Sequence, residues 1–212
     1  MSVVVVFEGL DYAGKSSLAE EVKARLTDAG YECILVNEPG CTPLGEHLRT
    51  VIKYPCRTIN EELDPKARIL LLNTARYENI RKNIIPALNE GKIVLVDRWL
   101  WTTLVYEHPE YSNFALMLHR EVCQNLNPNY IFYCDVDFNS FIERRGERDN
   151  SDEIEDRIYG LFDEKRTRYL QLADDEKNCR VFGTHTTIEE RAKAATKIIR
   201  DMYNYRRRKQ AK

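Results

Sequence analysis

The strongest constraint on the fold lies in the first seventeen residues. A run of valines followed by Phe7, typical of a buried strand, leads directly into Glu8-Gly9-Leu10-Asp11-Tyr12-Ala13-Gly14-Lys15-Ser16-Ser17. The order of strand, Gly-x-x-x-x-Gly-Lys-Ser and helix is that of a P-loop, in which backbone N–H groups surround phosphate oxygens. Apolar residues at every fourth position predict the helix over residues 15–27. The segment therefore predicts a nucleoside triphosphate site.

Individual residues of this loop suit different parts of a phosphate chain. Gly9 and Gly14 allow the tight turn. Lys15 supplies a positive charge for the terminal phosphates, and the hydroxyl of Ser16 is a natural Mg²⁺ ligand. The helix directs the positive end of its dipole at the same anion. The residues that we expect to contact the nucleotide are Gly9, Asp11, Tyr12, Ala13, Gly14, Lys15, Ser16 and Ser17.

Composition narrows the class of protein. A chain of 212 residues, 43% of them hydrophobic, can bury one sizeable core, so we expect a single α/β domain over residues 1–212. The net charge of −2 does not favour nucleic-acid or membrane partners, and the basic stretch 206–209 is interpreted as a solvated helix end. No targeting segment or membrane span is visible. Six cysteines without Cys-x-x-Cys pairing favour free thiols and a cytoplasmic protein.

Short apolar runs alternate with helical stretches along the whole chain. Such alternation predicts a five-stranded parallel sheet with helices on both faces. The predicted strands are Val3–Glu8, Cys33–Asn37, Ile93–Asp97, Tyr130–Asp135 and Arg180–Phe182. The last helix is expected to begin at Thr187, where Thr187-x-x-Glu190 forms a capping box.

A second polar group follows the third predicted strand, which runs straight into Asp97-Arg98. Ligands of parallel sheets gather at the carboxyl ends of the strands. Asp97 can orient Mg²⁺ or its waters there, and Arg98 can hold a second phosphate. A surface ion pair is the alternative, and it is less attractive because the preceding strand reads as buried.

Two further segments carry weaker signals. In the predicted helix over residues 64–89, Arg68, Leu72 and Arg76 share one face, which indicates either a polar ligand or a solvated stripe. The loop at 38–46, rich in glycine and proline, follows the second strand and precedes Arg49.

The most polar stretch of the chain, residues 143–157, lies between the fourth strand and a helix. It is either a solvated loop or a mobile, arginine-bearing lid over the phosphates, and the sequence alone favours neither.

Taken together these segments resemble the thymidylate kinases, a family of P-loop nucleoside monophosphate kinases. The resemblance covers nearly the whole chain in the family's order, and it implies a three-layer fold with a short lid. It rests on residues 7–17, Glu38-Pro39-Gly40, Thr74-Ala75-Arg76, Ile85-Pro86-Ala87-Leu88, Asp97-Arg98, Tyr106 and Tyr169-Leu170.

The resemblance implies transfer of the γ-phosphate of ATP to dTMP, with Mg²⁺ as cofactor and a homodimeric assembly. Lys15, Asp97 and Arg98 are then catalytic, and Ser16 and Asp97 are the metal residues. Asp11 is expected to contact the 3′-hydroxyl of the acceptor, and Tyr106 to pack under its sugar and select deoxyribose.

The implied acceptor site is larger than these residues. Arg98 and Arg49 are expected to hold the 5′-phosphate, and Arg76 to hydrogen-bond the base. The full set is Asp11, Glu38, Pro39, Arg49, Leu72, Arg76, Arg98, Thr102, Tyr106 and Glu107.

The family supplies its transition-state arginine either from the P-loop or from the lid. Tyr12 occupies the P-loop position, so the chain resembles the bacterial type, and a divergent viral lineage working in a host cytoplasm is left open. Arg148 is the first candidate in the lid and Arg144 the second.

Two departures from the family lie near the expected base. Leu72 stands where a phenylalanine usually stacks on thymine, and Glu107 stands where glutamine is common. They suggest either a broadened or modified-pyrimidine specificity or neutral divergence.

Two other functions are compatible with part of this pattern. A deoxynucleoside kinase shares the P-loop sheet but lacks arginines for a monophosphate, whereas this chain has Arg98 beside the 38–40 loop. A nucleotide-binding module without catalysis is disfavoured because Lys15, Ser16 and Asp97 are all present.

Overall fold

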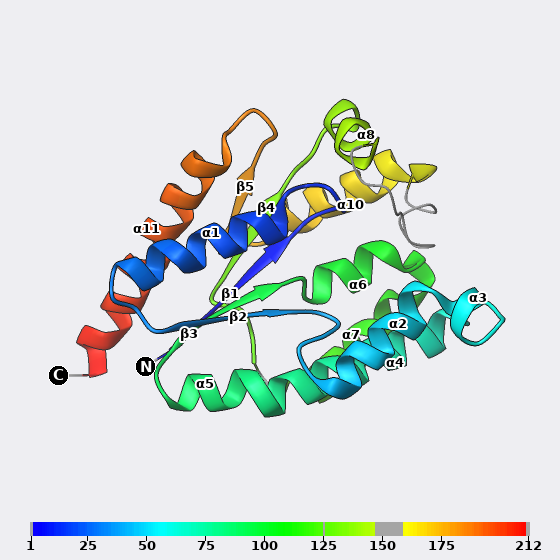
Figure 1. Ribbon diagram of the computed structural model, residues 1–212, viewed down its shortest axis with the longest axis horizontal. Helices are drawn as coiled ribbons and strands as arrows, with labels where there is room; N and C mark the ends of the chain where they lie inside the picture. The colour runs from blue at the N-terminus through cyan, green and yellow to red at the C-terminus, as the bar shows by residue number, and fades with distance from the viewer. Residues whose placement is uncertain (1, 125, 147–158, 211–212) are drawn as a thin grey trace.

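The computed structural model describes residues 2–124, 126–146 and 159–210, and their centre is a parallel β-sheet (Figure 1). The predicted five strands are confirmed, with β4 ending one residue earlier and β5 beginning one residue earlier than expected. Their order is β2-β3-β1-β4-β5. The strands are β1 (Val3–Glu8), β2 (Cys33–Asn37), β3 (Ile93–Asp97), β4 (Tyr130–Cys134) and β5 (Cys179–Phe182).

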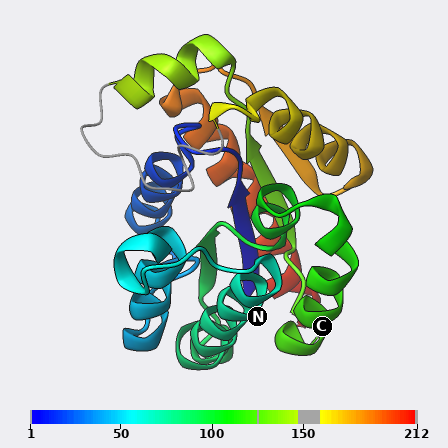
Figure 2. The same cartoon turned by 90° about the vertical axis from the view of Figure 1, so that its right-hand side faces the viewer.

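Helices cover both faces of this sheet (Figures 1 and 2). α1 and α11 pack together on one face, and α5, α6, α7 and α10 lie on the other. The helices are α1 (Lys15–Asp28), α2 (Pro43–Lys53), α3 (Pro55–Thr58), α4 (Pro65–Asn79), α5 (Ile85–Asn89), α6 (Leu100–Tyr106), α7 (Ser112–Cys123), α8 (Phe138–Gly146), α10 (Phe162–Asp175) and α11 (Ile188–Gln210), with short turns η1 (Ile80–Ile84) and η2 (Pro109–Tyr111).

The helix predicted over residues 64–89 is not a regular α-helix throughout. It begins as predicted, because the side chain of Asp64 accepts hydrogen bonds from the backbone N–H of Lys66 and Ala67. Between α4 and α5 the turn η1 is π-helical. Pro86 follows this turn and has no backbone N–H to donate. In a regular α-helix its ring would collide with the carbonyl four residues earlier, and the wider π-helical turn avoids this collision.

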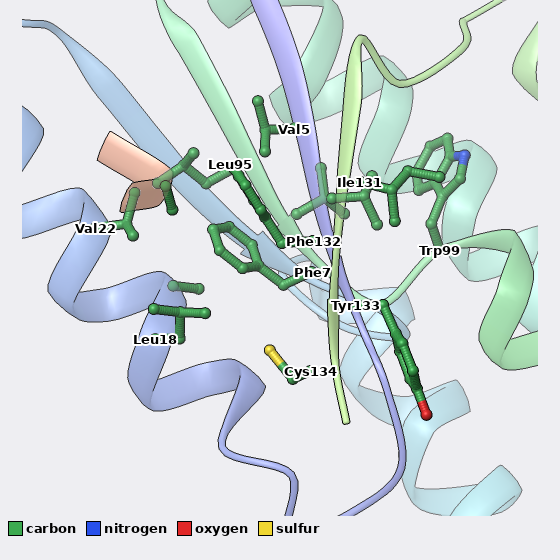
Figure 3. Close-up of a cluster of buried hydrophobic side chains, with 14 of the residues drawn as sticks. Val5, Phe7, Leu18, Val22, Leu95, Trp99, Ile131, Phe132, Tyr133 and Cys134 are labelled. Carbon is green, nitrogen blue, oxygen red and sulfur yellow. The ribbon is translucent and has the colours of Figure 1, made fainter. Parts of the chain in front are cut away.

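The core lies on both faces of β1, all of whose residues are buried. Toward α1, Phe7 and Phe132 pack above Leu18, with the two rings 5.5 Å apart (Figure 3). On the opposite face Tyr133 stacks on Tyr169 of α10, with ring centroids 5.2 Å apart. Burial on both faces explains the uninterrupted apolar runs and holds the carboxyl ends of the strands in place.

The strand order brings three loops together. β1 lies between β3 and β4, and β3 lies between β2 and β1. The P-loop after β1, the loop after β2 and Arg98 after β3 therefore meet at one edge of the sheet.

The predicted capping box at the start of α11 is confirmed. Thr187 and Glu190 exchange hydrogen bonds between side chain and backbone at the start of α11, as the predicted capping box requires. All six cysteines are free thiols. In the described ranges, no helix is both long enough and apolar enough to cross a membrane.

Candidate active site

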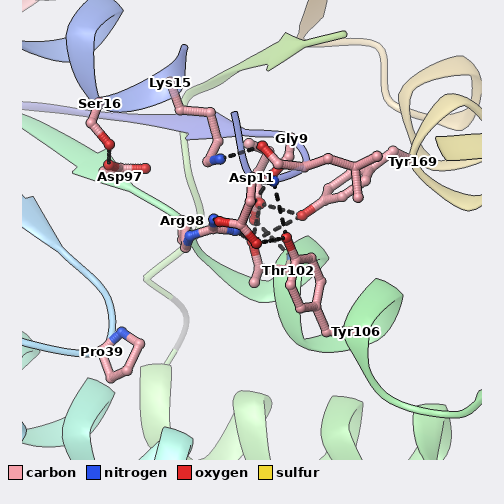
Figure 4. Close-up of polar contacts among 12 residues, drawn as sticks. Gly9, Asp11, Lys15, Ser16, Pro39, Asp97, Arg98, Thr102, Tyr106 and Tyr169 are labelled. Carbon is pink, nitrogen blue, oxygen red and sulfur yellow. Dashed lines mark hydrogen bonds and ion pairs between the residues drawn. The ribbon is translucent and has the colours of Figure 1, made fainter. Parts of the chain in front are cut away.

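The P-loop adopts the tight turn that its glycines predict. Gly9 has a φ of 146° and Gly14 a φ of 82°. A Cβ atom on Gly9 would lie 2.4 Å from the carbonyl oxygen of Cys134, so only glycine fits. The ammonium of Lys15 donates to the carbonyl of Leu10 at 2.6 Å (Figure 4). Burial, together with the charge of Arg98, lowers the pKa of Lys15 to about 8.

Ser16 and Asp97, the predicted metal residues, are in contact. The hydroxyl of Ser16 donates to Oδ2 of Asp97 at 2.5 Å (Figure 4). Oδ1 of Asp97 is buried and has no hydrogen-bond partner. Two adjacent oxygens, one of them an unpaired carboxylate oxygen beside the P-loop, fit the donor set that Mg²⁺ prefers.

Asp11 of the P-loop forms a polar cluster with Arg98 and Tyr106 (Figure 4). Arg98 forms an ion pair with Oδ1 of Asp11, and the hydroxyl of Tyr106 donates to Oδ2 at 2.6 Å. Burial acts to raise the pKa of Asp11, but the charges of Arg98 and Lys15 and the Tyr106 hydrogen bond outweigh it and lower the pKa to about 2. Asp11 is therefore ionised at neutral pH.

An acceptor-sized cavity of about 520 Å³ opens beyond this cluster, between α2, α4, α6 and α10. Its volume lies within the range of small-molecule sites. It is lined by nine of the ten residues predicted to bind the acceptor, namely Asp11, Glu38, Pro39, Arg49, Leu72, Arg98, Thr102, Tyr106 and Glu107. We call it the acceptor cavity.

Arg76, the tenth predicted residue, lies behind the cavity wall. Its side chain is 3% exposed, and its Nε donates to Oε2 of Glu38 at 2.6 Å. The remaining guanidinium nitrogens contact the carbonyl of Trp99, the hydroxyl of Thr103 and Nδ1 of His119. In this structure Arg76 holds Glu38 in place, and its contact with the base stays a prediction.

Glu8 is a site residue that the sequence interpretation missed. It is completely buried, and its carboxylate accepts hydrogen bonds from the backbone N–H of Trp99 and from the hydroxyl of Thr102. Burial raises its pKa despite these bonds. Glu8 thereby fixes the start of α6, and the only sequence signal is an acidic residue at the end of an otherwise apolar strand.

The far end of the acceptor cavity carries charges. Arg68 donates from two nitrogens to the two carboxylate oxygens of Glu107, each at 2.7 Å. Lys165 of α10 also lines this end, buried and 3.5 Å from Glu164. Leu72 lies one helical turn from Arg68 on α4 and faces the same cavity.

A second cavity of about 630 Å³, which we call the donor cavity, lies on the other side of the P-loop. Arg144 lines it and donates to the carbonyl of Tyr12 at 2.9 Å. The ring of Tyr12 packs edge-on against Phe141, with centroids 5.4 Å apart. Other lining residues include Ala13, Gly14, Ser17, Thr187 and Arg191. Arg148 and most of the predicted lid, from residue 147 on, lie outside the described residues.

The comparison with protein families shows which family of enzymes the chain belongs to. The family model described as thymidylate kinase matches residues 7–195. The chain belongs to the thymidylate kinase family. It is therefore an ATP-dependent nucleoside monophosphate kinase, and the prediction from its sequence is confirmed.

Individual relatives agree with this assignment. The chain is 31% identical to a thymidylate kinase of Pseudoalteromonas translucida (strain TAC 125) over 202 residues, covering 94% of this chain and 96% of the relative. It is 32% identical to a thymidylate kinase of Blochmanniella pennsylvanica (strain BPEN) over 190 residues, covering 88% and 89%. The crystal structure of thymidylate kinase from Ehrlichia chaffeensis shares the fold, with a TM-score of 0.71 at 22% identity over 94% of this chain and 98% of that one.

Proposed function

We propose that this kinase transfers the γ-phosphoryl group of ATP to dTMP and forms ADP and dTDP. The observation that carries the proposal is a small cavity of about 130 Å³ that we call the transfer cavity. It is lined by Lys15 and Ser16 of the P-loop on one side and by Arg49 and Arg98 of the acceptor cavity on the other. A phosphate held on each side would meet there.

On the donor side, the P-loop would surround the ATP phosphates and Lys15 would neutralise the terminal ones. Ser16 and Asp97 would hold Mg²⁺, which supplies charge neutralisation of the phosphate oxygens when bound. Arg144 would lie over the donor nucleotide, since it already lines the donor cavity. Arg148 remains our first candidate for the transition-state arginine.

On the acceptor side, Arg98 and Arg49 would hold the 5′-phosphate, and Asp11 would accept a hydrogen bond from the 3′-hydroxyl. Tyr106 would pack under the sugar and disfavour a 2′-hydroxyl. Leu72 and Pro39 would give the base an apolar contact. These groups position and neutralise charge, which is the main catalytic task in phosphoryl transfer.

The direct test is an ADP-release assay with ATP and Mg²⁺, in which the acceptor is dTMP, thymidine or absent. We expect turnover with dTMP only. Turnover with thymidine but not with dTMP would instead indicate a deoxynucleoside kinase. ATP binding without turnover on any acceptor would indicate a nucleotide-binding module.

A specific observation also supports a wider or modified-pyrimidine acceptor range. The base end of the cavity presents Leu72 in place of an aromatic ring, beside the Arg68–Glu107 ion pair. Loss of an aromatic stacking partner is worth about 1 kcal/mol. A panel of dTMP, dUMP, dCMP, dGMP and 5-substituted dUMPs tests this, and a strong preference for dTMP alone would contradict it.

Assembly and location also belong to the proposal. By family resemblance we propose that the chain acts as a single domain, as a homodimer, in the cytoplasm. Size-exclusion chromatography with light scattering distinguishes a dimer from a monomer of 24.9 kDa.

A further inference from the structure

Lys53, the last residue of α2, lines both the acceptor cavity and the transfer cavity. Arg49 lies four residues earlier on the same helix, so the two side chains share one helical face. The residues that line both cavities are Asp11, Glu38, Arg49, Lys53 and Arg98. α2 thus directs two cations at the place where donor and acceptor phosphates meet.

The charge of Lys53 acts on the polar cluster of this site. Besides burial, which raises it, the pKa of the Asp11 carboxyl responds to the charges of Arg98, Lys15 and Lys53 and to the Tyr106 hydrogen bond. Lys53 is therefore electrostatically coupled to the site, although it lies outside the P-loop and outside the acceptor motifs.

Cationic side chains outnumber acidic ones in the lining of the transfer cavity. Its cationic side chains are Lys15, Arg49, Lys53 and Arg98, and its acidic ones are Asp11, Asp97 and Glu38. Glu38 is already neutralised by Arg76 at 2.6 Å. A lining in which cationic side chains outnumber acidic ones suits a transferring phosphoryl group.

Position 12 of the P-loop does not supply a cation to the transfer cavity. It is a tyrosine, and its ring packs against Phe141 of α8. Arg144, in the same helix, lines the donor cavity on the far side of the loop. A positive charge from α2 approaches the transfer cavity from the opposite, acceptor side.

We propose that Lys53 is a catalytic residue that contacts the γ-phosphoryl group during its transfer and stabilises the charge on its oxygens. This inference rests on the proposed kinase function. An oxygen of the acceptor 5′-phosphate forms a bond to the γ-phosphorus as the bond to the β–γ bridging oxygen breaks, and that oxygen leaves with the electron pair on ADP. No proton is released when the acceptor attacks as a dianion, so the cations only neutralise charge.

The test compares Lys53→Met and Lys53→Arg with the wild type in the ADP-release assay. We expect Lys53→Met to lower kcat at least about tenfold, and on the order of a hundredfold if the contact equals other single charge contacts in transition states. KM for ATP should change less than about threefold, because the P-loop is intact. Lys53→Arg keeps the charge and should restore most of kcat.

The matched control is Lys23→Met, which removes an exposed lysine of α1 and should leave kcat unchanged. Thermal unfolding shows whether each variant folds, and Lys53→Gln replaces Lys53→Met if the latter does not. A Lys53→Met enzyme with wild-type kcat overturns the inference. So does a rise in KM for dTMP with kcat unchanged, which would indicate ground-state binding only.

The two proposals fail differently. If the wild type turns over dTMP and the Lys53 variants match it, only the role of Lys53 is rejected. If the wild type phosphorylates no nucleoside monophosphate, the proposed function itself is rejected.

Discussion

Replacing Asp11 by asparagine removes the carboxylate that both Arg98 and Tyr106 contact. The pKa of Asp11 is about 2 in the folded protein, against an ordinary value of 3.8. The difference corresponds to about 2 kcal/mol of stability at neutral pH. The variant also removes the ion-pair partner of the Arg98 guanidinium, which is 18% exposed and keeps hydrogen bonds of 3.4 Å to Gly9 and Thr102 and a contact with the ring of Tyr106. We therefore expect Asp11→Asn to cost between about 2 and about 4 kcal/mol at pH 7.

The pH dependence separates this cause from a general loss of packing. Because the folded pKa is the lower one, the stability that Asp11 contributes is complete above about pH 4 and is lost as the pH falls toward about 2. About half of it should be gone at pH 3, so the gap between wild type and Asp11→Asn should narrow by about 1 kcal/mol between pH 7 and pH 3.

Urea unfolding of both proteins at pH 7, 5, 4 and 3 measures this gap. The control is Asp201→Asn, since Asp201 is 65% exposed and pairs with Lys197 on the surface of α11. It should cost less than about 0.5 kcal/mol at any of these pH values. A gap between wild type and Asp11→Asn that stays constant from pH 7 to pH 3 would refute the assignment of the effect to the ionised carboxylate.

Three further outcomes follow from the P-loop. Gly9→Ala should destabilise the protein by more than about 2 kcal/mol and abolish ATP turnover, because its Cβ would collide with the carbonyl of Cys134; Gly183→Ala, where the new Cβ meets nothing within 4 Å, should be neutral in thermal unfolding. Ser16→Ala should raise the Mg²⁺ concentration needed for half-maximal kcat at least about tenfold, and an unchanged Mg²⁺ titration would count against the metal site. Since Lys15 has a pKa of about 8, its charge is present below that pH, so kcat/KM for ATP should fall as the pH rises from 7 to 9; a flat profile would contradict this.

The strands and the P-loop could be predicted from the sequence because their signals are local. The run Val3–Val6 is buried on both faces of the sheet, so it is apolar throughout and its bounds are sharp. The helix over residues 64–89 was predicted correctly at its start, where Asp64 caps it. Its π-helical turn was not predicted, because the effect of Pro86 on the preceding turn depends on how the whole helix packs.

The composition of the site could be predicted only in part. The resemblance placed Asp11, Arg98 and Tyr106 in one site, and the structure brings them together. The pairing of Arg68 with Glu107, 39 residues apart, could not be predicted, because sequence spacing says nothing about which charged residues meet across a fold. The same holds for Glu8, whose bonds to α6 reach residues more than ninety positions away.

The charge of the side chains around the transfer cavity could not be predicted from the overall composition of the chain. The chain has a net charge of −2, yet four cationic side chains line the transfer cavity. They are Lys15, Arg98 and two residues of α2, Arg49 and Lys53. These cations come from the P-loop, from the residue after β3 and from α2, and the parallel strand order brings these segments to one edge of the sheet. Once Arg49 is placed in the cavity, helical geometry requires Lys53 to follow it, since residues four apart share a face. The role of Lys53 is therefore a consequence of where α2 lies, which no local pattern in the sequence specifies.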